Sequence, residues 1–303
     1  MAVTLAERIQ QIVGEEAVRT NVPMSSCTTF RIGGPADVLV RPSDNAQIRS
    51  ILELCRENEV PVTVIGNGSN LLVSDAGFRG VIIRLDQNFQ KAQIHENTIT
   101  AQAGLLLANL AALAREHDLT GLEYASGIPG TVGGAVWMNA GAYDGEIRDS
   151  FVCAEVLTRD LEEKTIPAEE MDLSYRHSRA MEEGWIVLQA EFRLEPGNPD
   201  EIRAKMEDYR KRRMEKQPLE WPSAGSTFKR PVGHFAGKLI MEAGLSGASV
   251  GGAQVSEKHC GFVINRGDAT AEDVRALIRL VQDRVMETSG IRLEPEVRFL
   301  GFD

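Results

Sequence analysis

The stretch of sequence that decides the fold is Gly121-Leu-Glu-Tyr-Ala-Ser-Gly-Ile-Pro-Gly-Thr-Val-Gly-Gly-Ala135, and Asn139-Ala-Gly-Ala-Tyr143 follows it closely. Seven of the 25 residues from 121 to 145 are glycine. Glycine permits positive φ and lets a backbone come within hydrogen-bond range of a ligand. Pro129 suits the first turn of a helix, whose free N–H groups would then face an anion. We therefore expect a loop that binds phosphate groups through its backbone.

A second glycine cluster, Gly66-Asn-Gly-Ser-Asn70, directly follows the apolar segment Pro61-Val-Thr-Val-Ile65, which reads as a strand. Its asparagines and serine supply short polar groups for phosphate or ribose. The cluster lacks the third glycine of the Rossmann pattern, and Gly233-His-Phe-Ala-Gly-Lys238 is one residue short of a Walker loop. A tight bend explains either cluster alone, but the two together favour a pyrophosphate cradle.

The composition is that of a globular chain with an acidic balance. The chain has 303 residues, of which 43% are hydrophobic and 25% charged, and 33 Lys+Arg against 44 Asp+Glu give a net charge of −11. These values exclude a disordered or collagen-like chain, and the length suggests two or three domains. Because phosphate neutralisation needs clustered cations, we expect no nucleic-acid or membrane partner.

The cysteines and the chain start indicate a cytosolic protein. The four cysteines are far apart and form no C-x-x-C pair, so we expect free, buried thiols and no metal site. The first eleven residues have no basic segment followed by an apolar one and read as a short helix. No window approaches the ~18 apolar residues of a membrane span.

Helical and strand periods alternate along the chain. Helices are expected over 44–58, 105–117, 199–216 and from a capping box at Thr270 to Gly290. Strands are expected at 38–40, 61–65, 81–85, 98–103, 151–158, 185–194 and 291–300. The Pro- and Gly-rich residues 195–199 mark a domain boundary. The chain is therefore predicted to be α+β or mixed α/β.

One serine and one carboxylate stand out near the C-terminus. Ser226 follows a glycine in the stretch 217–231, whose three prolines predict a loop, and Lys229 and Arg230 come shortly after. Such a serine is either an ordinary turn residue or a proton donor or nucleophile whose oxyanion these cations or water stabilise. Glu296 lies on the polar face of the expected strand 291–300, facing solvent or a cleft.

Residues 210–216 contain five cations among seven residues, the clearest local reversal of the acidic field. A solvated helix face is the ordinary explanation. The alternative is a phosphate site, where arginine offers a bidentate fork.

Taken in order, these residues resemble the UDP-N-acetylenolpyruvoylglucosamine reductase family. The matching stretches are Thr28-Thr-Phe-Arg-Ile-Gly-Gly-Pro-Ala-Asp37, residues 66–70, 121–135 and 139–143, Tyr175-Arg-His-Ser178, Gly225-Ser-Thr-Phe228 and Glu294-Pro-Glu-Val-Arg298. They span nearly the whole chain in the expected order, which makes the resemblance specific. The length resembles the short form, which lacks a loop bearing a substrate-covering tyrosine. Cys27 and Arg230 stand where other members often carry asparagine.

The resemblance implies an α+β fold. Its FAD-binding region is of the vanillyl-alcohol-oxidase/PCMH type, with subdomains at 1–86 and 87–198, followed by a smaller α+β substrate domain at 199–303. It also implies cofactors FAD and NADPH, the substrate UDP-N-acetylglucosamine enolpyruvate, and reduction of its enolpyruvyl group to give UDP-N-acetylmuramate in peptidoglycan synthesis. A monomer is favoured.

The family's functional residues transfer to matching positions. Ser226 is expected to donate the proton, with Arg176 and Glu296 as catalytic partners. Cofactor contacts are expected at Gly66, Asn67, Gly68, Ser69, Asn70, Gly127, Ile128, Gly130, Thr131, Gly133, Gly134, Asn139 and Gly141. Substrate contacts are expected at Tyr175, Arg213, Lys216, Lys229 and Arg230.

Two other functions stay open at this point. One is an FAD-dependent oxidase of the same cofactor-binding superfamily, which would pass electrons to oxygen. The other is a non-catalytic UDP-sugar sensor. The presence of Ser226, Arg176 and Glu296 argues against a sensor, because a sensor has no need of a proton donor.

Overall fold

The computed structural model describes residues 4–302, which form two compact units built from interleaved segments. Unit 1 contains residues up to 19, 38–67 and 81–213, and unit 2 contains residues 20–37, 68–80 and those from 214 onward. The domain boundaries expected after residues 86 and 198 stay a prediction. The two compact units have other boundaries than these domains, because residues 20–37 and 68–80 belong to the same unit as the C-terminal segment.

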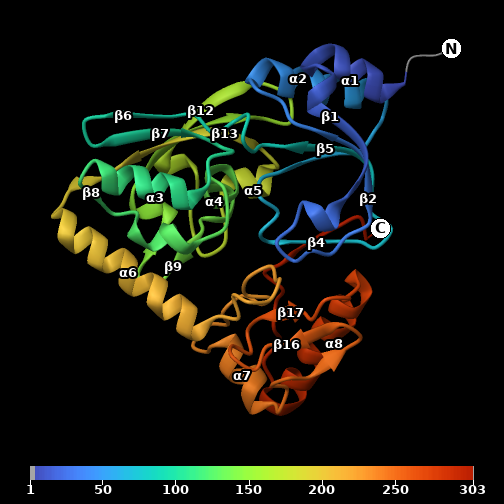
Figure 1. Cartoon of the computed structure of the whole chain (residues 1–303), viewed down its shortest axis with the longest axis vertical. Coiled ribbons are helices and arrows are strands. Elements are labelled where there is room, and N and C mark those ends of the chain that lie inside the picture. The colour runs from blue at the N-terminus through green and yellow to red at the C-terminus, as the bar shows by residue number, and fades with distance from the viewer. Residues whose placement is uncertain (1–3, 303) are drawn as a thin grey trace. The chain divides into compact units, whose positions relative to one another are not determined.

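Unit 1 contains an antiparallel sheet of order β12-β11-β13-β7-β6. Its strands are β6 (Ala92–His95), β7 (Thr98–Gln102), β11 (Phe151–Leu157), β12 (Glu163–Pro167) and β13 (Ile186–Arg193). Helices α3 (Leu107–Glu116) and α4 (Val132–Met138) lie together against one face of this sheet (Figure 1). Leu110 and Val136 from these helices share a core with Ile99 and Phe192 from the strands. The helices thereby hold the glycine-rich stretch against the sheet.

A second sheet has the order β1-β2-β5-β3. Its strands are β1 (Val18–Pro23), β2 (Pro35–Val40), β3 (Val62–Ile65) and β5 (Phe78–Arg84), and helices α1 (Leu5–Val13) and α2 (Asn45–Glu57) accompany it. The predicted apolar stripe of α2 is confirmed, since Ile48, Ile51 and Cys55 are buried. Strands β3 and β5 run parallel with Ile65 opposite Arg84, so the chain leaves the sheet at Gly66.

Unit 2 is centred on an antiparallel sheet of β15 (Ser249–Val250), β16 (Ala253–Val255) and β17 (Val263–Asn265), with α7 (Ala236–Glu242) and α8 (Ala271–Ser289). The predicted stripe of α8 is confirmed, because Val274, Leu277, Ile278, Val281 and Val285 are all buried in one cluster. Strand β18 (Arg298–Leu300) pairs in parallel with β4 (Leu71–Val73), which joins the chain end to a segment more than 200 residues earlier.

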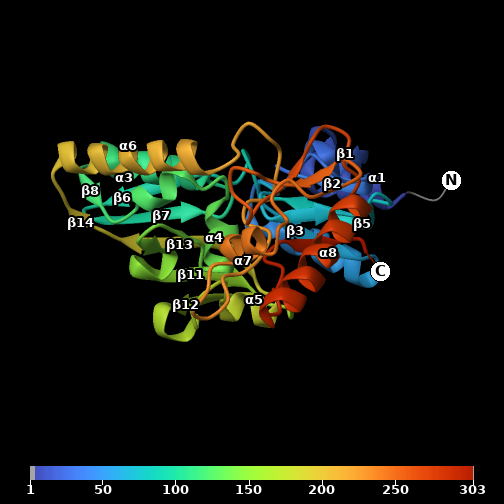
Figure 2. The same cartoon turned by 90° about the horizontal axis from the view of Figure 1, so that it is seen from below.

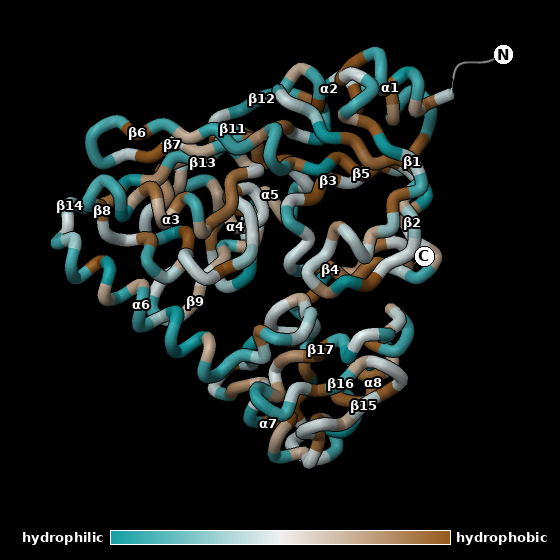
Figure 3. The backbone as a smooth tube through the Cα atoms, viewed as in Figure 1, coloured by the Kyte–Doolittle hydropathy of each residue, from teal (hydrophilic) through white to brown (hydrophobic). Residues whose placement is uncertain are grey.

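Helix α6 (Pro199–Lys216) begins at the predicted proline. It lies beside α3 in both views of the ribbon (Figures 1 and 2). Figure 3 shows it as hydrophilic along most of its length, and its buried residues are Ile202 and Tyr209. Helix α6 is therefore attached to unit 1 by a few contacts while its charged side chains stay outside.

Short elements complete the two units. They are β8 (Leu119–Thr120), β9 (Gly141–Ala142), β10 (Gly145–Glu146), β14 (Glu195–Pro196), α5 (Arg179–Glu183), and the 3-10 turns η1 (Glu15–Ala17), η2 (Met24–Ser26), η3 (Glu123–Gly127), η4 (Ile147–Asp149) and η5 (Ala168–Glu170).

The expected strand over 291–300 is wrong for most of its length, since only β18 is a strand. Pro295 has no N–H to donate, and it meets Phe228 in a single isolated bridge. Leu293 and Val297 are buried, whereas Phe299 is 42% exposed and packs edge-on against Phe302.

The cysteines match their prediction with one difference. All four are free thiols, and Cys153 is only half-buried while the others are buried. Desolvation raises the pKa of the Cys55 thiol to about 11, which keeps it protonated and unreactive. Within residues 4–302, no helix combines the length and the apolar character needed to cross a membrane.

Asp75 connects the early segment of unit 2 to its longest helix. Its carboxylate accepts hydrogen bonds from the N–H groups of Ala271 (2.8 Å) and Glu272 (3.1 Å), at the start of α8. Thr270 and Asp273 add the predicted capping box. The first turn of α8 thus has its donors satisfied, partly by a residue nearly 200 positions away in the sequence.

Replacing Asp75 by alanine should lower the free energy of unfolding by about 1–2 kcal/mol, because two helix N–H groups lose a charged acceptor. Chemical denaturation checks this. Glu287→Ala is the control on the same helix, since it removes only the exposed pair with Arg284 and should change stability by less than about 0.5 kcal/mol. Equal effects of the two variants would contradict the assignment.

Candidate functional site

The two glycine clusters meet in unit 1 at Gly66. A Cβ atom at this position would lie 2.2 Å from Thr131 Oγ1, so the approach is possible only for glycine. Beside it, the Asn67 side chain donates to the Pro129 carbonyl at 2.7 Å. The structure therefore brings the two clusters together, as a shared cradle requires.

The loop 66–70 presents several backbone donors. The N–H groups of Asn67, Gly68 and Ser69 have no acceptor among the described residues. Gly68 adopts φ +63°, and successive N–H groups around such a residue form a concave site for anions. This loop has the donor set that a dinucleotide phosphate needs.

The second cluster uses its backbone differently from the prediction. Ile128, Val132 and Gly133 donate their N–H groups to Ala125, Leu105 and Ala103, respectively. Helix α4 begins at Val132 with Thr131 as N-cap, so the expectation that Pro129 opens the helix is wrong.

The glycine at 133 therefore serves packing. Its Cβ would lie 2.7 Å from the Ala103 Cβ on the adjoining backbone, and its N–H is already bonded. Because the N–H groups of Ile128 and Gly133 are engaged internally, these two positions do not offer the backbone donors expected of them. Gly134 has open space, with Thr131 Oγ1 at 3.7 Å.

Asn139 has its side chain engaged inside the protein, and the cofactor contact expected of it stays a prediction. It is fully buried in the left-handed conformation, and its side-chain amide donates to Glu146 Oε2 (3.0 Å) and the Ser174 carbonyl (2.9 Å). Its Oδ1 accepts from the Arg148 N–H at 3.0 Å. Both donor hydrogens are thus used inside the protein, and they connect the end of α4 to the turn at 174–177.

That turn carries Arg176. Ser174 and His177 exchange backbone hydrogen bonds of 3.2 and 3.1 Å, which leaves Tyr175 and Arg176 at its tip. Arg176 has φ +55°, a conformation that costs a non-glycine residue about 1–3 kcal/mol and is found mainly where surrounding structure imposes it. Its guanidinium donates to the Gly141 carbonyl at 3.2 Å and lies over the Tyr175 ring, 5.0 Å from the centroid. Gly141 therefore holds Arg176 through its carbonyl.

Arg213 is the member of the predicted cationic run that turns toward the glycine loop. A Cβ on Gly127 would lie 3.0 Å from Arg213 Nη1. Tyr143 stacks on Tyr209 with ring centroids 4.5 Å apart, beside this guanidinium. Desolvation lowers the pKa of Arg213, and no carboxylate pairs with it among the described residues, whereas Arg212 is paired with Asp208. A half-buried cation without a counter-ion favours an anionic ligand.

Ser226 and Glu296 come together in unit 2. Ser226 is half-buried, and its hydroxyl has no hydrogen-bond partner among the described residues. The Glu296 N–H donates to the carbonyl of Thr227 at 2.8 Å, and the Asn70 side chain donates to the Glu296 carbonyl at 3.1 Å. The backbone segments that carry Ser226 and Glu296 are therefore neighbours, joined through Thr227.

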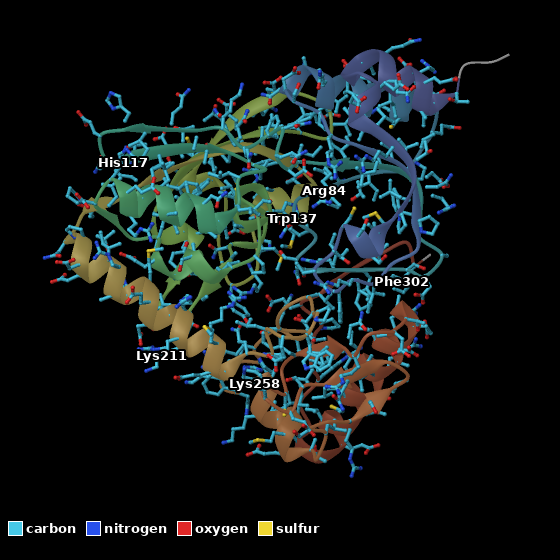
Figure 4. All side chains as sticks on the ribbon, in the orientation of Figure 1. Arg84, His117, Trp137, Lys211, Lys258 and Phe302 are labelled. Carbon is cyan, nitrogen blue, oxygen red and sulfur yellow. The ribbon has the colours of Figure 1, made fainter. Side chains whose placement is uncertain are left out.

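The other predicted substrate residues differ in their surroundings. Lys229 pairs with Glu294 at 3.1 Å, and the Arg230 guanidinium lies 3.9 Å from the centroid of Phe235. Lys216 is exposed at the end of α6, where the labelled Lys258 donates to the Met214 carbonyl (Figure 4). Lys211, also labelled, is exposed.

Sequence reasoning missed Thr227 and Tyr143. Thr227 is 3% exposed and bonds to two other segments of unit 2, at residues 261–263 and at Glu296. No sequence signal distinguishes Thr227, since residues 226–229 (Ser-Thr-Phe-Lys) show no polar–apolar alternation. The position of Tyr143 depends on its backbone conformation (φ +56°) and on its stacking against Tyr209 of α6. The residues adjacent to Tyr143 in the sequence predict neither of these.

Comparisons with known proteins identify the family of the chain. Residues 36–163 match an FAD binding domain, and residues 217–300 match the C-terminal domain of UDP-N-acetylenolpyruvoylglucosamine reductase. UDP-N-acetylenolpyruvoylglucosamine reductase of Agathobacter rectalis is 53% identical, with 98% of each chain covered. The enzyme of Clostridioides difficile is 47% identical, with 96% of each covered.

A solved structure gives the same result for the fold. The crystal structure of the reductase from Thermus caldophilus superposes with a TM-score of 0.80 at 37% identity, covering 93% of this chain and 99% of the other. Together with the FAD binding domain match, this confirms the predicted fold class, an α+β chain with a PCMH-type FAD-binding region.

The adjacent glycines of α4 offer a matched test of the packing argument. Gly133→Ala should destabilise the protein by about 1–3 kcal/mol, because the new methyl group would overlap Ala103. Gly134→Ala meets only ordinary contacts and should be neutral or stabilising by up to ~1 kcal/mol, since alanine favours the helix. Thermal unfolding of both variants measures the difference. A larger loss of stability in Gly134→Ala than in Gly133→Ala would refute the packing argument.

Proposed function

Because the chain belongs to the UDP-N-acetylenolpyruvoylglucosamine reductase family, we propose that its glycine loops, Arg176, Ser226 and Glu296 carry out that family's reaction. The reaction is the NADPH-dependent reduction of UDP-N-acetylglucosamine enolpyruvate to UDP-N-acetylmuramate, a step in peptidoglycan precursor synthesis. The chain is an FAD-containing oxidoreductase. The observation that carries the assignment of residues is the free Ser226 hydroxyl beside the Glu296 backbone. We place the enzyme in the cytosol as a monomer.

The residues of the loop 66–70 suit FAD. Its unbonded N–H groups at Asn67, Gly68 and Ser69 match the oxygen acceptors of a diphosphate, and the absence of a side chain at Gly66 keeps the approach open. Bound FAD supplies the redox chemistry, carrying hydride from NADPH to the β-carbon of the enolpyruvyl group. The protein supplies the position of the reacting groups and the electrostatic field around them.

Ser226 is assigned as the proton donor. Once hydride reaches the β-carbon, negative charge develops on the α-carbon and spreads into the substrate carboxylate. A serine hydroxyl with no internal acceptor is available to deliver its proton to that carbon. Glu296, on the neighbouring segment, is assigned to orient the substrate or to help return a proton to the serine.

Arg176 is assigned to the substrate carboxylate. A guanidinium offers paired donors to a carboxylate and stabilises the charge that forms next to it. The turn that holds Arg176 at positive φ and its bond to the Gly141 carbonyl fix the direction of the side chain before substrate arrives. Such preorganisation is the main source of electrostatic catalysis.

Arg213 is assigned to the diphosphate of FAD in preference to the substrate expected from the sequence. The reason is its contact with Gly127 in the loop predicted for the flavin phosphates. The guanidinium then provides the one side-chain cation of a cradle otherwise made of backbone, against the net charge of −11.

Ser226→Ala should retain flavin reduction by NADPH and lose flavin reoxidation by the enolpyruvyl substrate, by roughly 100- to 10,000-fold. Stopped-flow absorbance of the flavin separates the two half-reactions. Ser249→Ala, an exposed serine of the same unit, serves as control and should leave both unchanged. Equal loss of both half-reactions in Ser226→Ala would contradict the proton-donor role.

Arg213→Ala should weaken FAD binding by about 10- to 100-fold, the loss expected for one charge-assisted hydrogen-bond pair. Arg213→Lys should fall in between, because it keeps the charge and loses the fork. Flavin fluorescence during titration of the apoprotein measures the affinity, with the exposed Arg210→Ala as control. If Arg213→Ala leaves the FAD affinity unchanged and weakens binding of the UDP-sugar, Arg213 is a substrate-binding residue, as expected from the sequence.

A further inference from the structure

Thr227 is the point in unit 2 where three backbone segments meet. Its N–H donates to the Gly261 carbonyl at 2.8 Å, and its own carbonyl accepts the Glu296 N–H at 2.8 Å. Its hydroxyl Oγ1 accepts the Val263 N–H at 2.9 Å. Every polar group of this residue is therefore bonded, and its side chain is 3% exposed.

The residue on the other side of Ser226 gives no comparable restraint. Gly225 adopts φ +75°, and a Cβ placed on it would have no neighbour within 4 Å. Gly225 therefore adds no side-chain packing to restrain the chain at this position. The direction of the Ser226 hydroxyl is therefore set mainly from the Thr227 side.

The acceptor for the Thr227 N–H is itself held in place. The Gly261 N–H donates to Nδ1 of His259 at 3.1 Å, which requires that this nitrogen carry no proton. The His259 ring packs edge-on against Phe262, with centroids 5.0 Å apart. The turn 259–262, which carries the acceptor of the Thr227 N–H, is thus held by contacts of its own.

The hydroxyl of Thr227 makes a hydrogen bond that its backbone groups cannot replace. Without Oγ1, the Val263 N–H would be a buried donor with no acceptor, and the segment 226–229 would lose its side-chain connection to β17. The segment 226–229 would then be able to rotate about its remaining hydrogen bond to Gly261. A shift of about 1 Å in a reacting group is enough to cost roughly 100-fold in rate.

We propose that Thr227 is a positioning residue, which fixes the Ser226 hydroxyl relative to Glu296 by joining the segment 226–229 to both β17 and the 294–296 segment. The proposal rests on the role of Ser226 as proton donor. It predicts a defect confined to proton delivery, since Thr227 itself touches neither substrate nor cofactor in this assignment.

The test compares Thr227→Val, which keeps the shape and removes the hydroxyl, with Thr227→Ser, which keeps the hydroxyl. In the FAD-loaded enzyme, Thr227→Val should slow flavin reoxidation by the enolpyruvyl substrate roughly 10- to 100-fold. Flavin reduction by NADPH should stay within about twofold of the native rate, and Thr227→Ser should restore reoxidation to within about threefold. The solvent isotope effect on reoxidation should rise in Thr227→Val, because proton transfer becomes the slow step.

The outcomes separate the two ideas. If Ser226→Ala reoxidises at the native rate, the proton-donor role fails and the positioning role fails with it. If Ser226→Ala is slow and Thr227→Val is native-like in both half-reactions, only the positioning role is overturned. Equal loss of both half-reactions in Thr227→Val shows a merely structural residue and also overturns it. Thr227→Ala, measured in the same way, replaces Thr227→Val should that variant not fold.

Discussion

The close approach of Gly66 to Thr131 is the constraint on which the functional part of unit 1 depends. Any side chain at Gly66 would overlap Thr131, and the contact sets the distance between the two glycine clusters. Asn67 then closes the junction through Pro129. The free N–H groups follow this junction directly in the chain, so the proposed anion site depends on backbone packing more than on side-chain chemistry.

The acidic balance of the chain gives this arrangement its electrostatic meaning. FAD, NADPH and a UDP-sugar are all anions, while the protein carries a net charge of −11. Neutral backbone dipoles can bind phosphate without changing that balance, and a half-buried arginine at 213 adds one cation where the dielectric is low. Most of the other cations are exposed, and several are paired with carboxylates.

The acid chemistry proposed for unit 2 has a different physical basis. Ser226 has on one side a glycine whose Cβ position is open, and on the other a fully bonded, buried threonine. This asymmetry gives the proposed proton donor a defined position while leaving its hydroxyl unbonded. Glu296 is held on the same framework through its backbone, so both groups move together.

Local patterns in the sequence determined much of this protein. The stripes of α2 and α8, the capping box at Thr270 and the start of α6 were all predicted, because they depend on residues three or four positions apart. The glycine clusters and Ser226 were also found, since glycine content and unusual neighbours are local properties. The family resemblance added Arg176 and Glu296 as candidates.

Only the tertiary structure decided which of these groups are available to a ligand. Asn139 and Gly133 have the right chemistry, but their donors are bonded to residues brought in by the fold. Arg213 and Thr227 acquire their importance from Gly127, Val263 and Glu296, which are distant in sequence. Whether a donor is free depends on long-range contacts, and a sequence pattern that reports short-range spacing carries no information about them.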